Sequence, residues 1–197
     1  MGKASNNRYL KWSSIIATIA TAVLALTAII TVYLTVAAWK VQQETARPYF
    51  ILKESPTVDL DDKLSFELRF YNVGTHPAVN LSSETLVFEE SLVGKPIHHD
   101  ESAIVNEIPK DASSSLVMTM PSAEVNPKQQ NIDAHYIVVD LQYADPILNE
   151  SYRQSIYLKW NGVLAGKIQS TVHVRVEEKG RILEYFQKQG IDPKTRS

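Results

Sequence analysis

Residues 64–70 read Leu-Ser-Phe-Glu-Leu-Arg-Phe, with an apolar side chain at every second position from Leu64 to Phe70. Because successive side chains of a strand point to opposite faces, this alternation predicts a β-strand with one buried face. Residues 171–176 alternate in the same way, whereas the β-branched and aromatic run 136–143 predicts a strand buried on both faces. These stretches place the domain that contains them in the β class.

Other strand candidates combine β-branched or aromatic residues with Pro, Gly, Asn and Asp at their ends. They are residues 49–53, 79–88, 115–120 and 152–160. About seven such strands, within the roughly 120–130 residues that one two-sheet core requires, predict an all-β immunoglobulin-like sandwich.

A short helix is predicted at residues 181–189, where Ile182, Leu183 and Phe186 share one helical face. Gly190 follows at the position where a left-handed residue commonly ends a helix. We expect this helix to pack on the sandwich.

An uncharged run of 26 residues, 13–38, contains neither Gly nor Pro. About 20 apolar residues suffice for a helix to cross the ~30 Å hydrocarbon core of a bilayer. Aromatic residues, which favour the headgroup boundary, bracket the run at both ends: Tyr9, Trp12, Tyr33 and Trp39. A buried helix of a soluble protein is the alternative, but such helices rarely stay uncharged on every face, so the run predicts a transmembrane helix.

A cleaved signal peptide is a second alternative, because Thr35, Val36 and Ala37 loosely resemble a cleavage site. However, the run is about twice as long as the usual 7–15-residue apolar region, and Trp39 crowds the cleavage position. We therefore expect an uncleaved signal anchor.

The orientation prediction depends on flanking charge. Lysine and arginine are equally numerous on both sides of the helix, but those before it are denser and have no acidic neighbours: Lys3, Arg8 and Lys11. By the positive-inside rule, this predicts a single-pass protein of the inner (plasma) membrane with a cytoplasmic N-terminus and an external C-terminal domain.

Small residues form a stripe along the membrane helix in heptad steps. Its members are Ser14, Thr18, Thr21, Ala25, Ala28, Val32 and Thr35. Small residues let helix backbones approach closely in lipid, so the stripe predicts a seam for homo-oligomerisation. The alternative is that an Ala- and Thr-rich helix shows such a stripe by chance.

Three segments follow from these patterns. Residues 1–46 hold the N-terminal tail, the membrane anchor and a juxtamembrane helix, which Pro48 ends because the residue before a proline avoids the α region. Residues 47–178 form the β-sandwich, and residues 179–197 form the short C-terminal helix and tail.

Three short motifs occur in order along the domain: Arg47-Pro48-Tyr49, then Asn-Val-Gly-Thr-His-Pro-Ala at 72–78, then Tyr143-Ala-Asp at 143–145. This arrangement resembles uncharacterised bacterial single-pass membrane-anchored proteins with an immunoglobulin-like sandwich. The resemblance implies architecture and no activity. In the second motif, Asn72 and Gly74 can adopt positive φ and Pro77 fixes the exit into the next strand, so we interpret it as a structural turn between strands and not as a ligand loop.

The search for chemistry gives no catalytic residue, cofactor site or metal site. The chain has no cysteine, and its seven glycines spell neither a phosphate-binding loop nor a nucleophile elbow. His98 and His99 stand next to Asp100 and Glu101, but adjacent residues of an extended chain face opposite sides, so we interpret residues 98–101 as a solvated polar loop.

Charge argues against one class of partner. Residues 54–111 carry twelve acidic and four basic side chains, and the whole chain has a net charge of −2. Nucleic-acid binding requires a basic surface and is disfavoured.

Three interpretations of the function remain. The first is a membrane-anchored module that binds or scaffolds an unidentified protein, and the second is an accessory subunit that acts through its membrane helix. The third is an enzyme whose site is assembled from distant residues, which the loop composition does not support.

Overall fold

The computed structural model describes residues 3–104 and 106–191. The chain divides into two compact units, Met1–Ala46 and Arg47–Ser197. Each unit is described by itself below.

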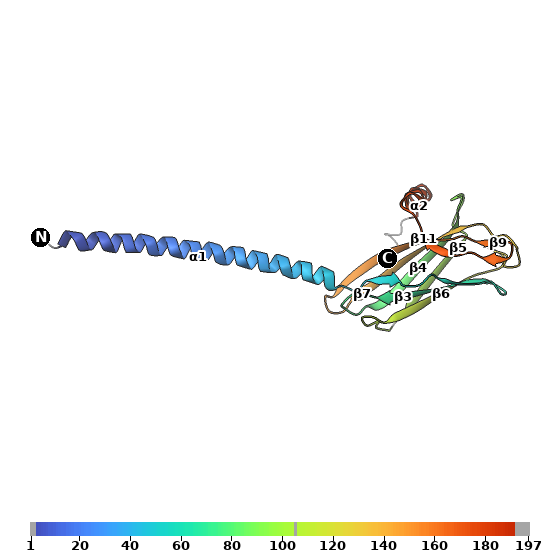
Figure 1. Cartoon of the computed structure of the whole chain (residues 1–197), viewed down its shortest axis with the longest axis horizontal. Coiled ribbons are helices and arrows are strands. Elements are labelled where there is room, and N and C mark those ends of the chain that lie inside the picture. Colours follow the sequence, from blue (N-terminus) through green and yellow to red (C-terminus); the bar gives the residue numbers. More distant parts are fainter. Residues whose placement is uncertain (1–2, 105, 192–197) are drawn as a thin grey trace. The chain divides into compact units, whose positions relative to one another are not determined.

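The first unit is one continuous helix, α1 (Lys3–Ala46), of 44 residues (Figure 1). Within it, Ser14–Ala46 has a mean hydropathy of 2.5 in its apolar window and is not buried against any other part of the described chain. Large apolar side chains such as Ile16, Leu24 and Val32 are exposed. The helix is therefore long and apolar enough to span a membrane.

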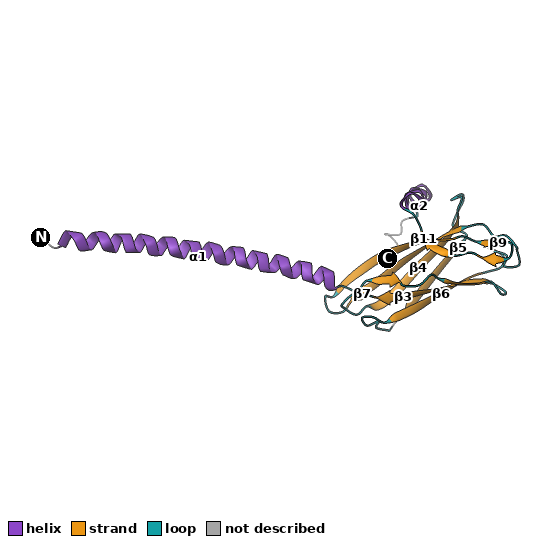
Figure 2. Cartoon of the chain, in the orientation of Figure 1, coloured by secondary structure: helices purple, strands orange, loops and turns teal. Residues whose placement is uncertain are grey.

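The second unit contains eleven strands and one helix, α2 (Val176–Gln189), among the described residues (Figure 2). The strands are β1 (Phe50–Leu52), β2 (Thr57–Asp59), β3 (Leu64–Asn72), β4 (Val79–Glu89), β5 (His98–Ile104), β6 (Ser113–Met120), β7 (His135–Asp145), β8 (Glu150–Trp160), β9 (Val163–Leu164), β10 (Lys167–Ile168) and β11 (Thr171–His173). The seven predicted strands all form, but the count of about seven was too low, because β2, β9 and β10 are too short to show a period and β5 is polar.

The strands form two larger antiparallel sheets and a β9–β10 hairpin. In one sheet, β3 pairs with β1 and β2 along one edge and with β6 along the other. The other sheet has the order β11-β8-β7-β4-β5. One cluster of buried side chains takes members from both sheets, for example Phe66 from β3 and Trp160 from β8, whose rings meet edge to face at 5.3 Å.

The predicted burial patterns hold for two of the three diagnostic stretches, 64–70 and 136–143. The prediction for 171–176 is wrong: only β11 (Thr171–His173) is a strand, Val172 is 44 % exposed, and Val176 begins α2. In β3, the four apolar positions of residues 64–70 are buried and their neighbours are not. In β7, both faces are buried because one meets the shared core, through Ile137 and Val139, and the other meets α2, through Tyr136 and Val138.

Helix α2 packs on the outer face of the five-stranded sheet, as predicted, but its details differ from the prediction. It begins at Val176, ahead of the predicted helix start at 181 and the predicted segment boundary at 179, because β11 ends at His173, before the end of the alternating run 171–176. Ile182 and Phe186 are buried as expected, whereas Leu183 is 41 % exposed and Tyr185 is buried in its place. The Tyr185 hydroxyl donates to the Gly94 carbonyl at 2.6 Å, so this ring satisfies its polar end while filling the interface.

The C-terminal end of α2 follows the prediction. Gly190 adopts φ 65° and ψ 23°, and the Ile191 amide donates to the Phe186 carbonyl at 2.9 Å. The Gly190 amide donates to the Gln187 carbonyl, which completes a Schellman motif.

Candidate functional site

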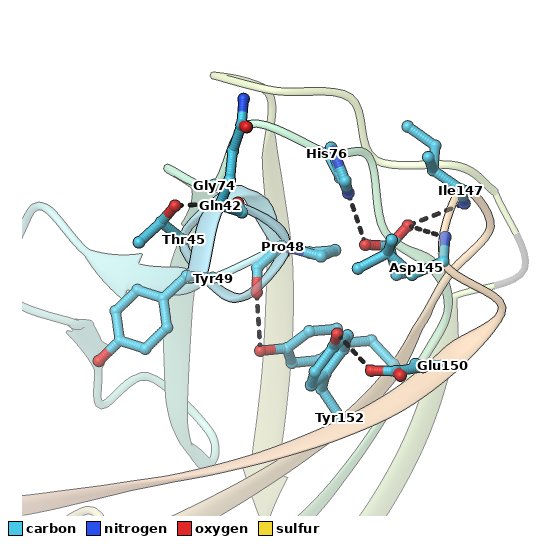
Figure 3. Close-up of polar contacts among 12 residues, drawn as sticks. Gln42, Thr45, Pro48, Tyr49, Gly74, His76, Asp145, Ile147, Glu150 and Tyr152 are labelled. Atoms are coloured by element: carbon cyan, nitrogen blue, oxygen red, sulfur yellow. Dashed lines mark hydrogen bonds and ion pairs between the residues drawn. The ribbon is translucent and has the colours of Figure 1, made fainter. Parts of the chain in front are cut away.

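The three motifs that carry the family resemblance converge at the corner where the β domain begins (Figure 3). We call this group the corner cluster. Its members are Arg47, Pro48, Tyr49, Asn72, Gly74, His76, Tyr143, Asp145, Tyr152 and Gln154.

Asn72, the last residue of β3, is the centre of the corner cluster and is fully buried. Its Oδ1 accepts from the backbone amides of Tyr49 at 3.2 Å and Gly74 at 3.0 Å. Its Nδ2 donates to the carbonyls of His76 at 2.8 Å and Ile108 at 3.2 Å. One side chain therefore satisfies four backbone groups from three separate segments, which a buried polar group requires.

Gly74 is needed for space and not for its backbone angle. Neither Asn72 nor Gly74 uses the positive φ that both residue types permit, because the positive-φ residues of the described chain are others. A Cβ on Gly74 would lie 2.2 Å from the Arg47 carbonyl oxygen, 2.7 Å from the Pro48 Cα and 2.8 Å from the Tyr49 nitrogen. The Arg47-Pro48-Tyr49 segment therefore crosses directly over the turn at residues 72–78.

Pro77 lies between this turn and β4. The next residue, Ala78, exchanges two backbone hydrogen bonds with Ile108, at 3.0 and 2.8 Å. The turn therefore leads from β3 in one sheet to β4 in the other.

Two side chains from the five-stranded sheet hold the start of the domain. The Tyr143 hydroxyl donates to the Pro48 carbonyl at 3.2 Å. Gln154 pairs with both backbone groups of Phe50, accepting from its amide at 3.1 Å and donating to its carbonyl at 2.5 Å. This amide therefore acts on β1 as a neighbouring strand would, although β1 and β8 belong to different sheets. Sequence reasoning missed Gln154, since a lone glutamine carries no signal.

His76 and Asp145 link the two turns of the corner cluster. His76 Nδ1 lies 2.7 Å from Asp145 Oδ2, and the other carboxylate oxygen accepts from the amides of Ile147 and Leu148 in the β7–β8 turn (Figure 3). A His–Asp pair also occurs in hydrolytic triads, which need a nucleophile on the second imidazole nitrogen. Among the described residues, no serine or threonine hydroxyl is hydrogen-bonded to His76. The pair supports the turn.

Two aromatic hydroxyls of the corner cluster resist ionisation. Burial raises the pKa of Tyr143 and that of Tyr152 to about 12. Glu150 accepts a hydrogen bond from the Tyr152 hydroxyl at 2.9 Å and also raises the pKa of Tyr152. The Arg47 guanidinium lies over the Tyr152 ring, 5.4 Å from its centroid.

The raised pKa of Tyr143 predicts a loss of stability at high pH. The folded domain keeps this proton above the ordinary pKa of 10.0, so the free energy of unfolding should fall as the pH rises from about 10 to about 12. One such group contributes a slope of about 1.4 kcal/mol per pH unit. Urea unfolding of the full chain in detergent measures this dependence. In Tyr143→Phe, the free energy of unfolding should fall with pH less steeply than in wild type, by about that amount. Identical slopes would mean that Tyr143 ionises normally.

The predicted membrane-helix residues all lie on α1. Trp12, Tyr33 and Trp39 are exposed, and the side chain of Tyr9 lies outside the described residues. Every residue of the predicted seam is exposed. The hydroxyls of Thr18, Thr21 and Thr35 donate to the carbonyls four residues earlier, at 2.8–2.9 Å, so these donors are satisfied within the helix.

Residues 98–101 form part of β5, so their interpretation as a loop is wrong. The register with β4 makes them a strand although neither face is apolar. His98 and His99 do face opposite sides: His98 Nδ1 lies 2.6 Å from a Glu124 carboxylate oxygen, whereas His99 contacts Glu84 and Glu101. The His99 group contains three residues whose ligand atoms lie within 4.8 Å of one another, which is close enough to hold a metal ion.

Most of the chain matches a known protein family. Residues 14–163 match a family described as a domain of unknown function, DUF8453. The chain belongs to this family. In this DUF8453 chain, the matched region begins inside the apolar part of α1, includes both larger sheets up to β8, and ends within β9. No curated protein matches the chain.

Proposed function

We propose that this DUF8453 protein is a single-pass membrane protein that displays an immunoglobulin-like β-sandwich outside the cytoplasm and binds or scaffolds a protein partner without catalysing a reaction. The observation that carries the proposal is an exposed helix with an uncharged stretch at residues 13–38, joined without a linker to a β domain whose first residues are held by the corner cluster. The two antiparallel sheets around one core support the immunoglobulin-like assignment.

The absence of cysteine makes the orientation directly testable. A single cysteine at the exposed position Ser170 should react with a membrane-impermeant maleimide in cells with an opened outer envelope, and one at Ser5 should react only after lysis. The reverse pattern would place the domain in the cytoplasm.

Partner binding by the domain is tested with two chimeras. In one, α1 is replaced by an unrelated membrane helix; in the other, α1 carries an unrelated soluble domain. Both are purified in detergent after crosslinking in cells, and co-purifying proteins are quantified by mass spectrometry. A stoichiometric partner retained by the first chimera supports the proposal, and one retained only by the second supports the accessory-subunit alternative. No stoichiometric partner of the full-length chain would contradict both.

Self-association through the seam is a separate prediction. Because three of its hydroxyls are satisfied within the helix, association would depend on close backbone packing. A dimerisation reporter fused to residues 1–46 should lose its signal when four seam residues become leucine: Thr18, Thr21, Ala25 and Ala28. It should keep the signal when four off-seam residues become leucine: Ile16, Ile19, Val23 and Ile30. Equal signals from the two variants would mean that the stripe only reflects the Ala- and Thr-rich composition of the helix.

A further inference from the structure

The outer face of the five-stranded sheet has a second cluster, built by strand register. Glu84 in β4 lies directly opposite Glu101 in β5, and His99 lies two residues before Glu101 on the same face of that strand. His99 Nε2 is 3.1 Å from Glu84 Oε1 and 3.6 Å from Glu101 Oε1. The cluster is outside the corner cluster and does not depend on the proposed function.

The same register places a third carboxylate in the row. Glu84 is also directly opposite Asp140 in β7, so three acidic residues lie side by side across β5, β4 and β7. Like charges in directly opposite positions destabilise a sheet unless a cation compensates them. At the β7 end Arg153 supplies it: its Nε donates to Asp140 Oδ2 at 2.6 Å, and Ser155 donates to the other oxygen at 3.4 Å. At the β5 end, the two glutamates share His99.

The distances at the β5 end match those between ligands of one metal ion. Zinc binds imidazole nitrogen at ~2.0–2.1 Å and carboxylate oxygen at ~2.0–2.2 Å, so neighbouring ligand atoms of a tetrahedral site are roughly 3.3–3.5 Å apart. The two His99 distances bracket this value, and all three ligand atoms lie within 4.8 Å of one another. The Glu84 side chain is only 15 % exposed and is therefore held in place, whereas that of Glu101 is 73 % exposed and can adjust.

We propose that Glu84, His99 and Glu101 bind one Zn²⁺ ion, with water in the remaining position. A surface groove of about 430 Å³ lies beside the two carboxylates and is lined by Glu84, Glu101, Asp140 and neighbouring serines, but not by His99. One imidazole with two carboxylates suits Zn²⁺ and related transition metals, whereas Ca²⁺ takes six to eight oxygen ligands and Mg²⁺ requires a near-ideal octahedral set.

Sequence reasoning considered His99 and Glu101 as possible metal ligands within residues 98–101 and preferred a solvated loop, but it missed Glu84 because it considered only neighbours along the chain. Glu84 lies in a different strand from His99, and only the β4–β5 register brings them together.

The test is calorimetric titration of the full-length, chelator-treated protein in detergent with ZnCl₂, with CaCl₂ and MgCl₂ as comparisons. The wild type should bind one Zn²⁺ per chain and neither of the other ions at similar concentrations. His99→Asn and Glu84→Gln should each weaken Zn²⁺ binding at least tenfold. The matched control His173→Asn removes an exposed histidine of β11 and should leave the affinity within twofold of wild type.

Two outcomes would overturn the proposal. One is the absence of saturable Zn²⁺ binding by the wild type, which is the result expected if a protonated His99 simply pairs with the two carboxylates. The other is a His99→Asn variant that binds Zn²⁺ as tightly as the wild type. A thermal shift measured with saturating ZnCl₂ gives an independent readout, because an ion that binds only the folded state raises the melting temperature. That shift should be present in the wild type and lost in His99→Asn.

Discussion

Replacing Gly74 by alanine is expected to lower the free energy of unfolding of the β domain by about 3 kcal/mol, at the upper end of the usual overpacking cost. The new Cβ would overlap backbone atoms of Arg47, Pro48 and Tyr49, and no flexible side chain can move aside to make room. The start of the domain would have to shift, which would break the bonds that hold it. Urea unfolding of the full chain in detergent, followed by the circular dichroism of the sheets, measures the change.

Gly180→Ala is the matched control for Gly74→Ala. Gly180 lies inside α2, and a Cβ there would meet nothing within 4 Å. Alanine favours a helix interior over glycine by about 1 kcal/mol, so this variant should be slightly more stable than wild type. Equal losses in the two variants would contradict the assigned role of Gly74.

Replacing Asn72 by aspartate is expected to cost about 3–5 kcal/mol near neutral pH, since it buries a charge without a counter-ion, although the Tyr49 and Gly74 amides still donate to one oxygen. The shape is preserved, but the amide nitrogen that donates to the His76 and Ile108 carbonyls becomes an oxygen that repels them. Burial raises the pKa of such a carboxyl in the folded state, so the cost should be smallest below about pH 4 and should grow as the pH rises. Urea unfolding of the variant at several pH values tests both the loss and its direction.

Asn80→Asp is the control for Asn72→Asp, because Asn80 is exposed and its backbone conformation suits aspartate as well as asparagine. It should change stability by less than about 0.5 kcal/mol. A pH-independent loss in Asn72→Asp, or a similar loss in both variants, would mean that the hydrogen-bond hub is not what stabilises this corner.

Local patterns predicted the parts of the fold that depend on local physics. The alternation of residues 64–70 identifies β3 because one of its faces is buried, and Gly190 ends α2 because its left-handed backbone closes a Schellman motif. The helical pattern selected the wrong side chain of α2 for burial, since Leu183 is exposed and Tyr185 is buried. Leu183 and Tyr185 lie on either side of the contact face, and the position of the Gly94 carbonyl selects Tyr185.

Several features that sequence reasoning missed depend on long-range pairing. Strand β5 has no apolar face of its own and becomes a strand through its register with β4. The role of Gly74 depends on the segment that crosses the turn. That segment lies 25 or more residues earlier in the chain, so no local pattern reveals the contact. Likewise, Gln154 binds the backbone of a strand from the other sheet.

The most direct test of the central claim, that an uncleaved α1 anchors the β domain in a membrane, is alkaline carbonate washing of membranes followed by intact-mass measurement of the protein. Because residues 13–38 of α1 carry no charge on any side and α1 is joined to the folded domain, the chain should stay in the pellet at its full mass of 22.1 kDa. Release into the supernatant, or a mature N-terminus near Ala38, would contradict the account and show that α1 is a signal peptide.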